Sequence, residues 1–269
     1  AFEHIFLREG LNPAVIEGDS YHRYDRVAMK EAMKKAEDEG NTNFSHFGPQ
    51  ANLFDKLSDT FETYSKSGSC ERRYYLHSDE EAKPFGQKPG EFTPWEKIPP
   101  GTDLLFYEGL HGGVVDGKTN VAKHVDMLIG VVPLVNLEWI QKIHRDCAQR
   151  GYSAEAVTDT ILRRMHDYVH FITPQFSRAD INFQRVPTVD TSNPFIARDI
   201  PTPDESFVVI RFQDPKKLDI DFPYLLSMLD DSFMSRRNSI VVPGGKMGFA
   251  MEIILAPIIE RMMKARKSA

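Results

Sequence analysis

The sequence predicts an α/β fold with a mixed, mostly parallel sheet flanked by helices. Short apolar, β-branched runs alternate with longer segments whose apolar residues recur at helical spacing, and this alternation is typical of a sheet covered on both faces. Ligands of such sheets bind outside the carboxyl ends of the strands, so the polar residues at those ends are the first candidates for function. The expected strands are 14–16, 104–107, 127–132, 208–212 and 239–242, and the expected helices are 27–39, 51–66, 137–150, 154–171 and 246–267, with a kink at Pro257.

Composition narrows the class of protein. A chain of 269 residues with 41% hydrophobic and 27% charged residues is typical of one globular domain with a lid or appendage. The net charge of −6 disfavours binding to bulk nucleic acid, so an anionic substrate would need a local cluster of Arg and Lys. The longest apolar runs fall short of the roughly 20 residues that cross a bilayer, so no membrane span is expected. Two cysteines, Cys70 and Cys147, indicate a reducing, cytoplasmic compartment and no disulfide framework.

The first candidate site follows the expected strand 14–16. Asp19 comes just after this strand, His22 three residues later, and Arg26 four residues beyond His22. A carboxylate here can accept a proton from a substrate hydroxyl, and an imidazole and a guanidinium one helical turn apart can bind a phosphate. The alternative is that Asp19 or Ser20 only caps a helix.

The second candidate is the expected strand 104–107, which ends in Glu108-Gly109. Four apolar residues followed by an acid at a strand's carboxyl end have the layout of a Walker B element, whose acid holds Mg²⁺ directly or through water. A buried strand that merely ends in a surface glutamate would give the same pattern.

The third candidate is the helix 137–150. Ile140 and Ile143 lie on its inward stripe, whereas Lys142, Arg145 and Asp146 share a polar face. Two cations beside an acid suit a phosphate clamp flanked by a carboxylate, although an ordinary solvated face would have the same composition. Arg150 follows one position beyond that face, next to Gly151.

Taken together, these segments resemble the bacterial class of phosphoribulokinases, and the resemblance extends from residue 1 to the final helix. It implies a fold similar to that of the nucleoside and nucleotide kinases, with a P-loop after the first strand and a lid helix. It also implies ATP-dependent phosphorylation of the C1 hydroxyl of ribulose 5-phosphate in the Calvin cycle, with Mg²⁺ as the metal. The strings that carry the resemblance are Glu17–Arg26, Leu104–Gly112, Pro133–Gly151, Thr158–Tyr168 and Asp180–Arg198.

The resemblance implies a role for each matching residue. Asp19 matches the catalytic base and a metal ligand, and Glu108 matches the metal-binding acid. Lys142 and Arg145 match the cations that stabilise the transferring phosphoryl group. Asp146 matches a second essential carboxylate, which could order the lid, assist with Mg²⁺ or share the base role. The residues implied to bind the sugar phosphate are His22, Arg26, Arg150 and His77.

Allosteric regulation is a further implication. The bacterial class resembled is activated by NADH and inhibited by AMP, and it forms homo-octamers. Four arginines match the positions associated with this regulation, namely Arg8, Arg164, Arg211 and Arg236.

The sequence departs from the family pattern in one respect: it contains no G-x-x-x-x-G-K-[ST] phosphate loop. Residues 1–10 read as the end of a helix closed by Gly10, so we expect a single kinase domain over 1–269, truncated before residue 1 where the P-loop belongs, with a lid at about 134–153. A uridine kinase-like nucleoside kinase, and a catalytically inactive homologue that senses NADH or AMP, are the alternatives.

Overall fold

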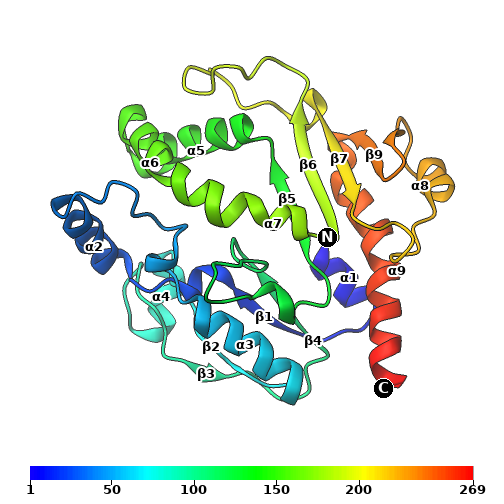
Figure 1. Cartoon of the computed structure of the whole chain (residues 1–269), viewed down its shortest axis with the longest axis horizontal. Helices are drawn as coiled ribbons and strands as arrows, with labels where there is room; N and C mark the ends of the chain where they lie inside the picture. Colours follow the sequence, from blue (N-terminus) through cyan, green and yellow to red (C-terminus); the bar gives the residue numbers. More distant parts are fainter. Residues whose placement is uncertain (269) are drawn as a thin grey trace. The chain divides into compact units, whose positions relative to one another are not determined.

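The computed structural model describes residues 1–268, and they divide into two compact units. The β1–β4 unit comprises residues 11–128 and 162–178. The five-stranded unit comprises residues 1–10 and 129–161 and the chain from Ala179 onward. The β1–β4 unit contains two two-stranded sheets and the other unit contains one five-stranded sheet, and most of the elements are labelled in Figure 1.

The β1–β4 unit is organised by two parallel strands, β1 (Pro13–Glu17) and β4 (Leu104–Glu108), which pair from Pro13 with Leu104 to Glu17 with Glu108. Alternation along β1 buries Ala14 and Ile16 in an apolar cluster shared with α3 (Phe54–Ser67), whose residues Phe54, Leu57 and Phe61 recur at helical spacing. The other elements of the unit are α2 (Arg26–Asp38), α4 (Asp79–Ala82), the antiparallel pair β2 (Glu71–Arg72) and β3 (Glu96–Lys97), the π-helical segment Tyr168–Ile172 and α7 (Thr173–Arg178).

The five-stranded unit has the strand order β5-β6-β7-β9-β8. Strands β5 and β6 are parallel, and every later pair of neighbours is antiparallel. Phe183, Ile210 and Ile240 lie on one face of the sheet and are fully buried. The long helix α9 contacts β9 and α1 (Figure 1). The residues of α6 (Ala154–Asp167) are divided between this unit and the β1–β4 unit. The other helices and strands of the five-stranded unit are α1 (Phe2–Arg8), β5 (Ile129–Pro133), α5 (Val135–Arg150), β6 (Ile181–Pro187), β7 (Ser206–Phe212), α8 (Phe222–Met228), β8 (Phe233–Arg236), β9 (Ser239–Pro243) and α9 (Met247–Ser268).

The expected mixed α/β arrangement is confirmed, and all five expected strands are present. Antiparallel pairing is more extensive than a mostly parallel sheet would have. For β8 and β9 the reason is local: only two residues, 237 and 238, separate these strands, and a parallel connection needs a dozen or more. Within residues 1–268, no helix is both long enough and apolar enough to cross a membrane.

The carboxyl ends of β1 and β4 approach each other closely at two glycines. A Cβ atom placed on Gly109 would lie 2.6 Å from the Cα of Gly18 and 2.6 Å from the Oη of Tyr107. A Cβ atom on Gly18 would meet the same tyrosine oxygen at 2.6 Å. Only glycine at both positions allows this approach, which holds the residues that follow the two strands close together.

We therefore expect Gly109→Ala to lower the free energy of unfolding by about 1–3 kcal/mol, the cost of overpacking a close-packed region. Chemical denaturation measures the change. Gly248→Ala is the matched control, because a Cβ atom on this helical glycine meets nothing within 4 Å. Equal stability of the Gly109 and Gly248 variants would contradict the close approach.

Candidate active site

Three carboxylates gather at the carboxyl ends of β1 and β4. Glu17 and Glu108 are register partners in the last pair of the two strands, and Asp19 follows two residues after Glu17. Burial raises the pKa of Glu17, His77 opposes the increase, and the negative charges of Glu108 and Asp19 add to it. The strand ends therefore form a concentrated patch of oxygen donors, as the sequence predicts for Asp19 and Glu108.

Two imidazoles flank the carboxylate of Asp19. The Nε2 atom of His22 lies 3.3 Å from Oδ1, and the Nε2 atom of His77 lies 3.5 Å from Oδ2. The hydrogen bond from His22 lowers the pKa of Asp19 below its ordinary value and, with the charges of both histidines, outweighs the opposite effect of burial. The side chain is 49% exposed. Asp19 is thus an ionised, accessible carboxylate that can accept a proton.

Arg26 lies next to this group. It is the first residue of α2, whose N-terminus is capped by the side chain of Asp25. Its backbone N–H donates to the carbonyl of Gly90, and its Nη2 atom donates to the carbonyl of His77 at 3.5 Å. The structure thus brings Asp19, His22, Arg26 and His77 together within the β1–β4 unit.

The backbone between Asp19 and His22 is held by Arg73. Its Nε and Nη2 atoms each donate at 2.8 Å, to the carbonyls of Ser20 and His22. The guanidinium also lies against the rings of Phe92 and Trp95, at 3.7 and 4.7 Å from their centroids. Because this planar guanidinium donates to two carbonyls and packs against two aromatic rings, it rigidly supports the loop that carries Asp19.

His111, which follows β4, has a structural role. Its side chain is buried, and burial lowers the pKa of its imidazole to about 4, so the ring is neutral at physiological pH. The Nε2 atom donates to the carbonyl of Phe47 at 2.9 Å, and the ring packs against Phe54 with a centroid distance of 4.8 Å. His111 therefore attaches the segment around Phe47 to the loop after β4.

A second charged cluster lies on α5 in the five-stranded unit. The carboxylate of Asp146 is 2.5 Å from the Nζ of Lys142, 3.1 Å from the Nε of Arg145 and 3.2 Å from an Nη of Arg150. Burial acts to raise the pKa of Asp146, but its hydrogen bonds with Lys142 and Arg145 and their charges outweigh this effect, and the pKa is lowered. The helix ends at Gly151, which has a φ of 69°.

The structure corrects the expected position of Asp146 on the polar face of α5. Its side chain is only 5% exposed, so it lies beneath the cations and not beside them on a solvated polar face. Helical periodicity correctly places Lys142, Arg145 and Asp146 together, but it does not reveal that the acid is buried.

The four arginines expected to bind effectors are not all in one unit. Arg211 on β7 and Arg236 on β8 are both register partners of Ser239 on the intervening strand β9. Arg8 lies on α1 of the same five-stranded unit. Arg164 belongs to the β1–β4 unit, where its guanidinium lies 5.0 Å from the ring centroid of Phe47. Within the five-stranded unit, Arg211 and Arg236 therefore lie on either side of one position of β9.

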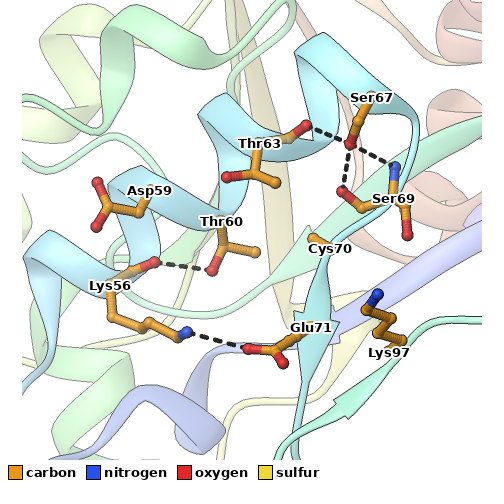
Figure 2. Close-up of a pocket in the computed structure, with 9 residues that line it drawn as sticks. All are labelled: Lys56, Asp59, Thr60, Thr63, Ser67, Ser69, Cys70, Glu71 and Lys97. Carbon is orange, nitrogen blue, oxygen red and sulfur yellow. Dashed lines mark hydrogen bonds and ion pairs between the residues drawn. The ribbon is translucent and has the colours of Figure 1, made fainter.

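A separate cavity of about 330 Å³ lies in the β1–β4 unit, lined by residues of α3 and of the β2–β3 pair (Figure 2). Its charges largely compensate one another: Lys56 lies 3.5 Å from Glu71, and Asp59 and Lys97 also line the wall. The hydroxyl of Thr60 donates to the backbone carbonyl of Lys56. None of the residues expected to act in catalysis or binding lines this cavity, so it is distinct from the candidate active site.

Sequence reasoning missed three polar residues at the candidate site: Glu17, Asn52 and Arg73. Glu17 could have been found, because it is the last residue of an apolar strand that immediately precedes Gly18-Asp19. The sequence around Arg73 and Asn52 does not indicate a functional site, because these residues contact the Asp19 loop from segments that carry no recognisable motif.

Comparison with known proteins supports a kinase site at this position in the sequence. Residues 1–192 match the family described as phosphoribulokinase / uridine kinase, and the chain belongs to this family of kinases. Over 268 residues it is 66% identical to the protein named "Phosphoribulokinase, plasmid" from Cupriavidus necator, with 100% of this chain and 91% of the relative covered. It is 59% identical to the phosphoribulokinase of Nitrobacter vulgaris, again with 100% of this chain and 92% of the relative covered.

A solved structure gives the same answer for the fold. The phosphoribulokinase from Rhodobacter spheroides aligns with 99% of this chain and 92% of its own, at a TM-score of 0.92 and 55% sequence identity. The expected kinase fold, with its mixed sheet and flanking helices, is thereby confirmed.

Proposed function

We propose that the protein transfers the γ-phosphoryl group of ATP to the C1 hydroxyl of ribulose 5-phosphate. The observation that carries this proposal is the ionised carboxylate of Asp19, which lies between two imidazoles at the strand end beside Glu108. The names of relatives at 59–66% identity support the same substrate.

In this reaction Asp19 accepts the proton of the C1 hydroxyl while the oxygen attacks the γ-phosphorus. A new O–P bond forms, the bond between the γ-phosphorus and the bridging oxygen breaks, and ADP leaves with the electron pair. The lowered pKa keeps Asp19 ionised before the reaction, as a general base requires.

Cationic side chains supply the rest of the chemistry. The family resemblance assigns the phosphate that ribulose 5-phosphate already carries to Arg26, Arg150 and His22, and it assigns a further substrate contact to His77. Lys142 and Arg145 stabilise the charge that develops on the transferring group, the largest contribution to catalysis of phosphoryl transfer. Uridine has no phosphate for these cationic groups to bind, and their presence therefore favours the sugar phosphate over a nucleoside.

For Asp146 the contacts favour an organising role over that of base. Its carboxylate is buried and accepts from Lys142 while facing Arg145 and Arg150, so it has no free side from which to take a substrate proton. It holds three mutually repelling cations together along the part of α5 from Lys142 to Arg150 until phosphate oxygens compete for them.

Mg²⁺ fits the carboxylates at the strand ends. Asp19 and Glu108, with Glu17 beside them, offer the oxygen donors that this ion prefers. Among the described residues no cluster of three or more His, Cys, Asp or Glu forms a ready cage, and this suits an ion held by one or two carboxylates together with substrate phosphates. When bound, Mg²⁺ neutralises charge on the β- and γ-phosphates.

The proposal extends to regulation and assembly. NADH as activator, AMP as inhibitor and a homo-octamer follow from the family resemblance. The cross-strand placement of Arg211 and Arg236 supports an anion site on the β7–β9–β8 surface. A cytoplasmic location agrees with Cys70 and Cys147, which are both free thiols.

Asp19→Asn in the full-length protein tests the base. We expect kcat to fall by about 10²–10⁴, the usual contribution of a positioned general base, with little change in KM for either substrate. Steady-state kinetics at saturating ATP measure both constants. Asp38→Asn, an exposed position at the end of α2, serves as the control. A kcat within a few-fold of wild type would remove Asp19 from the base role.

Arg211→Ala and Arg236→Ala test the effector site. We expect turnover without effector to stay near wild type, while the NADH concentration for half-maximal activation rises about fivefold or more, as loss of an effector contact requires. Activity titrated with NADH gives the result, and the neighbouring turn residue Arg237→Ala is the matched control. Normal activation curves for both variants would place the NADH site elsewhere.

A further inference from the structure

Asn52 is a buried polar residue in contact with the candidate active site. It is 2% exposed and lies just before α3. An antiparallel bridge joins its backbone to His22, flanked by hydrogen bonds from Leu53 N to Tyr21 O and from Arg23 N to Ala51 O, each 2.8 Å long. Backbone hydrogen bonds alone therefore hold these two segments side by side.

The orientation of the Asn52 amide is fixed by its neighbours. The Nδ2 atom donates two hydrogen bonds of 2.8 Å, to the carbonyls of His46 and Gly48. Rotating the amide by 180° would place its oxygen against two carbonyl oxygens, which cannot donate. The Oδ1 atom must therefore face His22, whose Nδ1 atom lies 2.9 Å away.

This orientation in turn fixes the imidazole of His22. The amide oxygen can only accept, so the Nδ1 atom of His22 carries a proton and donates it. The opposite ring nitrogen, Nε2, then points at Oδ1 of Asp19, 3.3 Å away. Because this oxygen also accepts, both contacts are hydrogen bonds when each ring nitrogen carries a proton. Flipping the ring would exchange both nitrogens for carbon atoms and break both contacts, so the chain Asn52–His22–Asp19 is complete in only one arrangement.

We propose that Asn52 is a positioning residue for phosphoryl transfer, which holds the His22 imidazole with Nδ1–H toward Asn52 and Nε2 toward Asp19 and the acceptor sugar. This inference rests on the proposed function for its kinetic consequence only. The fixed ring is a preorganised contact: its orientation is set before substrate binds, so no conformational entropy is lost at that step. The family resemblance assigns no role to Asn52.

Other contacts to His22 do not replace this one. Arg73 binds only the backbone carbonyl of His22 and leaves the ring free to rotate. The rings of His46 and Tyr75 face the imidazole at centroid distances of 5.8 and 6.4 Å, both at steep angles, and pack without fixing which nitrogen points where. His77 approaches the other oxygen of Asp19.

The kinetic test is a double-mutant cycle in the full-length protein. Asn52→Ala should lower kcat/KM for ribulose 5-phosphate by about 10–100-fold, the usual loss when a residue that orients an active-site group is removed, and should leave KM for ATP unchanged. In a His22→Ala background the same substitution should cost less than about twofold, because its target is gone. Asn43→Ala, an exposed asparagine nearby, is the matched control.

An equal loss in both backgrounds would overturn the proposal, because Asn52 would then act only through the turn at His46 and Gly48. If Asn52→Ala does not fold, nuclear magnetic resonance of wild-type protein with ¹⁵N-labelled histidine decides the question. We expect the Nδ1 proton of His22 to be protected from exchange with water, and an Nδ1 without a proton would refute the arrangement. This measurement needs no turnover, so a wild type that ignores ribulose 5-phosphate would refute the proposed function and not the Asn52–His22 contact.

Discussion

The close approach of β1 and β4 at Gly18 and Gly109 is the constraint on which the candidate active site depends. The two strands run parallel, so their carboxyl ends emerge at the same edge. Because neither glycine carries a Cβ atom, the backbones nearly touch there, with the hydroxyl of Tyr107 buried behind them. Asp19 and Glu108 each lie within one residue of these glycines. The acids owe their proximity to backbone packing, which keeps them together despite their mutual repulsion.

The two carboxylates with proposed roles both have basic side chains as partners, but with opposite consequences. Asp19 is partly exposed, and its imidazole partners leave it open to a substrate hydroxyl. Asp146 is buried under Lys142, Arg145 and Arg150, so that its charge is used to hold those cations in place. The pKa is lowered in both carboxylates, so it is their exposure that separates the proposed base, Asp19, from the proposed organiser of positive charge, Asp146.

The sequence predicts those parts of the site that depend on local pattern. An apolar run that ends in an acid locates Glu108, and helical spacing groups Lys142 with Asp146. Strand β6 could have been predicted too, because Ile181 and Phe183 alternate with polar residues. Arg73 and Asn52 could not, because they contact the Asp19 loop across 53 and 30 residues of sequence and only the folded chain brings them there. Burial of Asp146 likewise depends on packing that periodicity does not encode.

The most direct test of this account is the identity of the phosphoryl acceptor. The full-length protein is incubated with Mg·ATP and either ribulose 5-phosphate or uridine, and the phosphorylated product is identified by ³¹P nuclear magnetic resonance. We predict a second phosphate ester on ribulose 5-phosphate, at C1, formed together with one ADP per product, and no reaction with uridine. Phosphorylation of uridine in preference to the sugar phosphate, or consumption of ATP without a new ester on either, would contradict it.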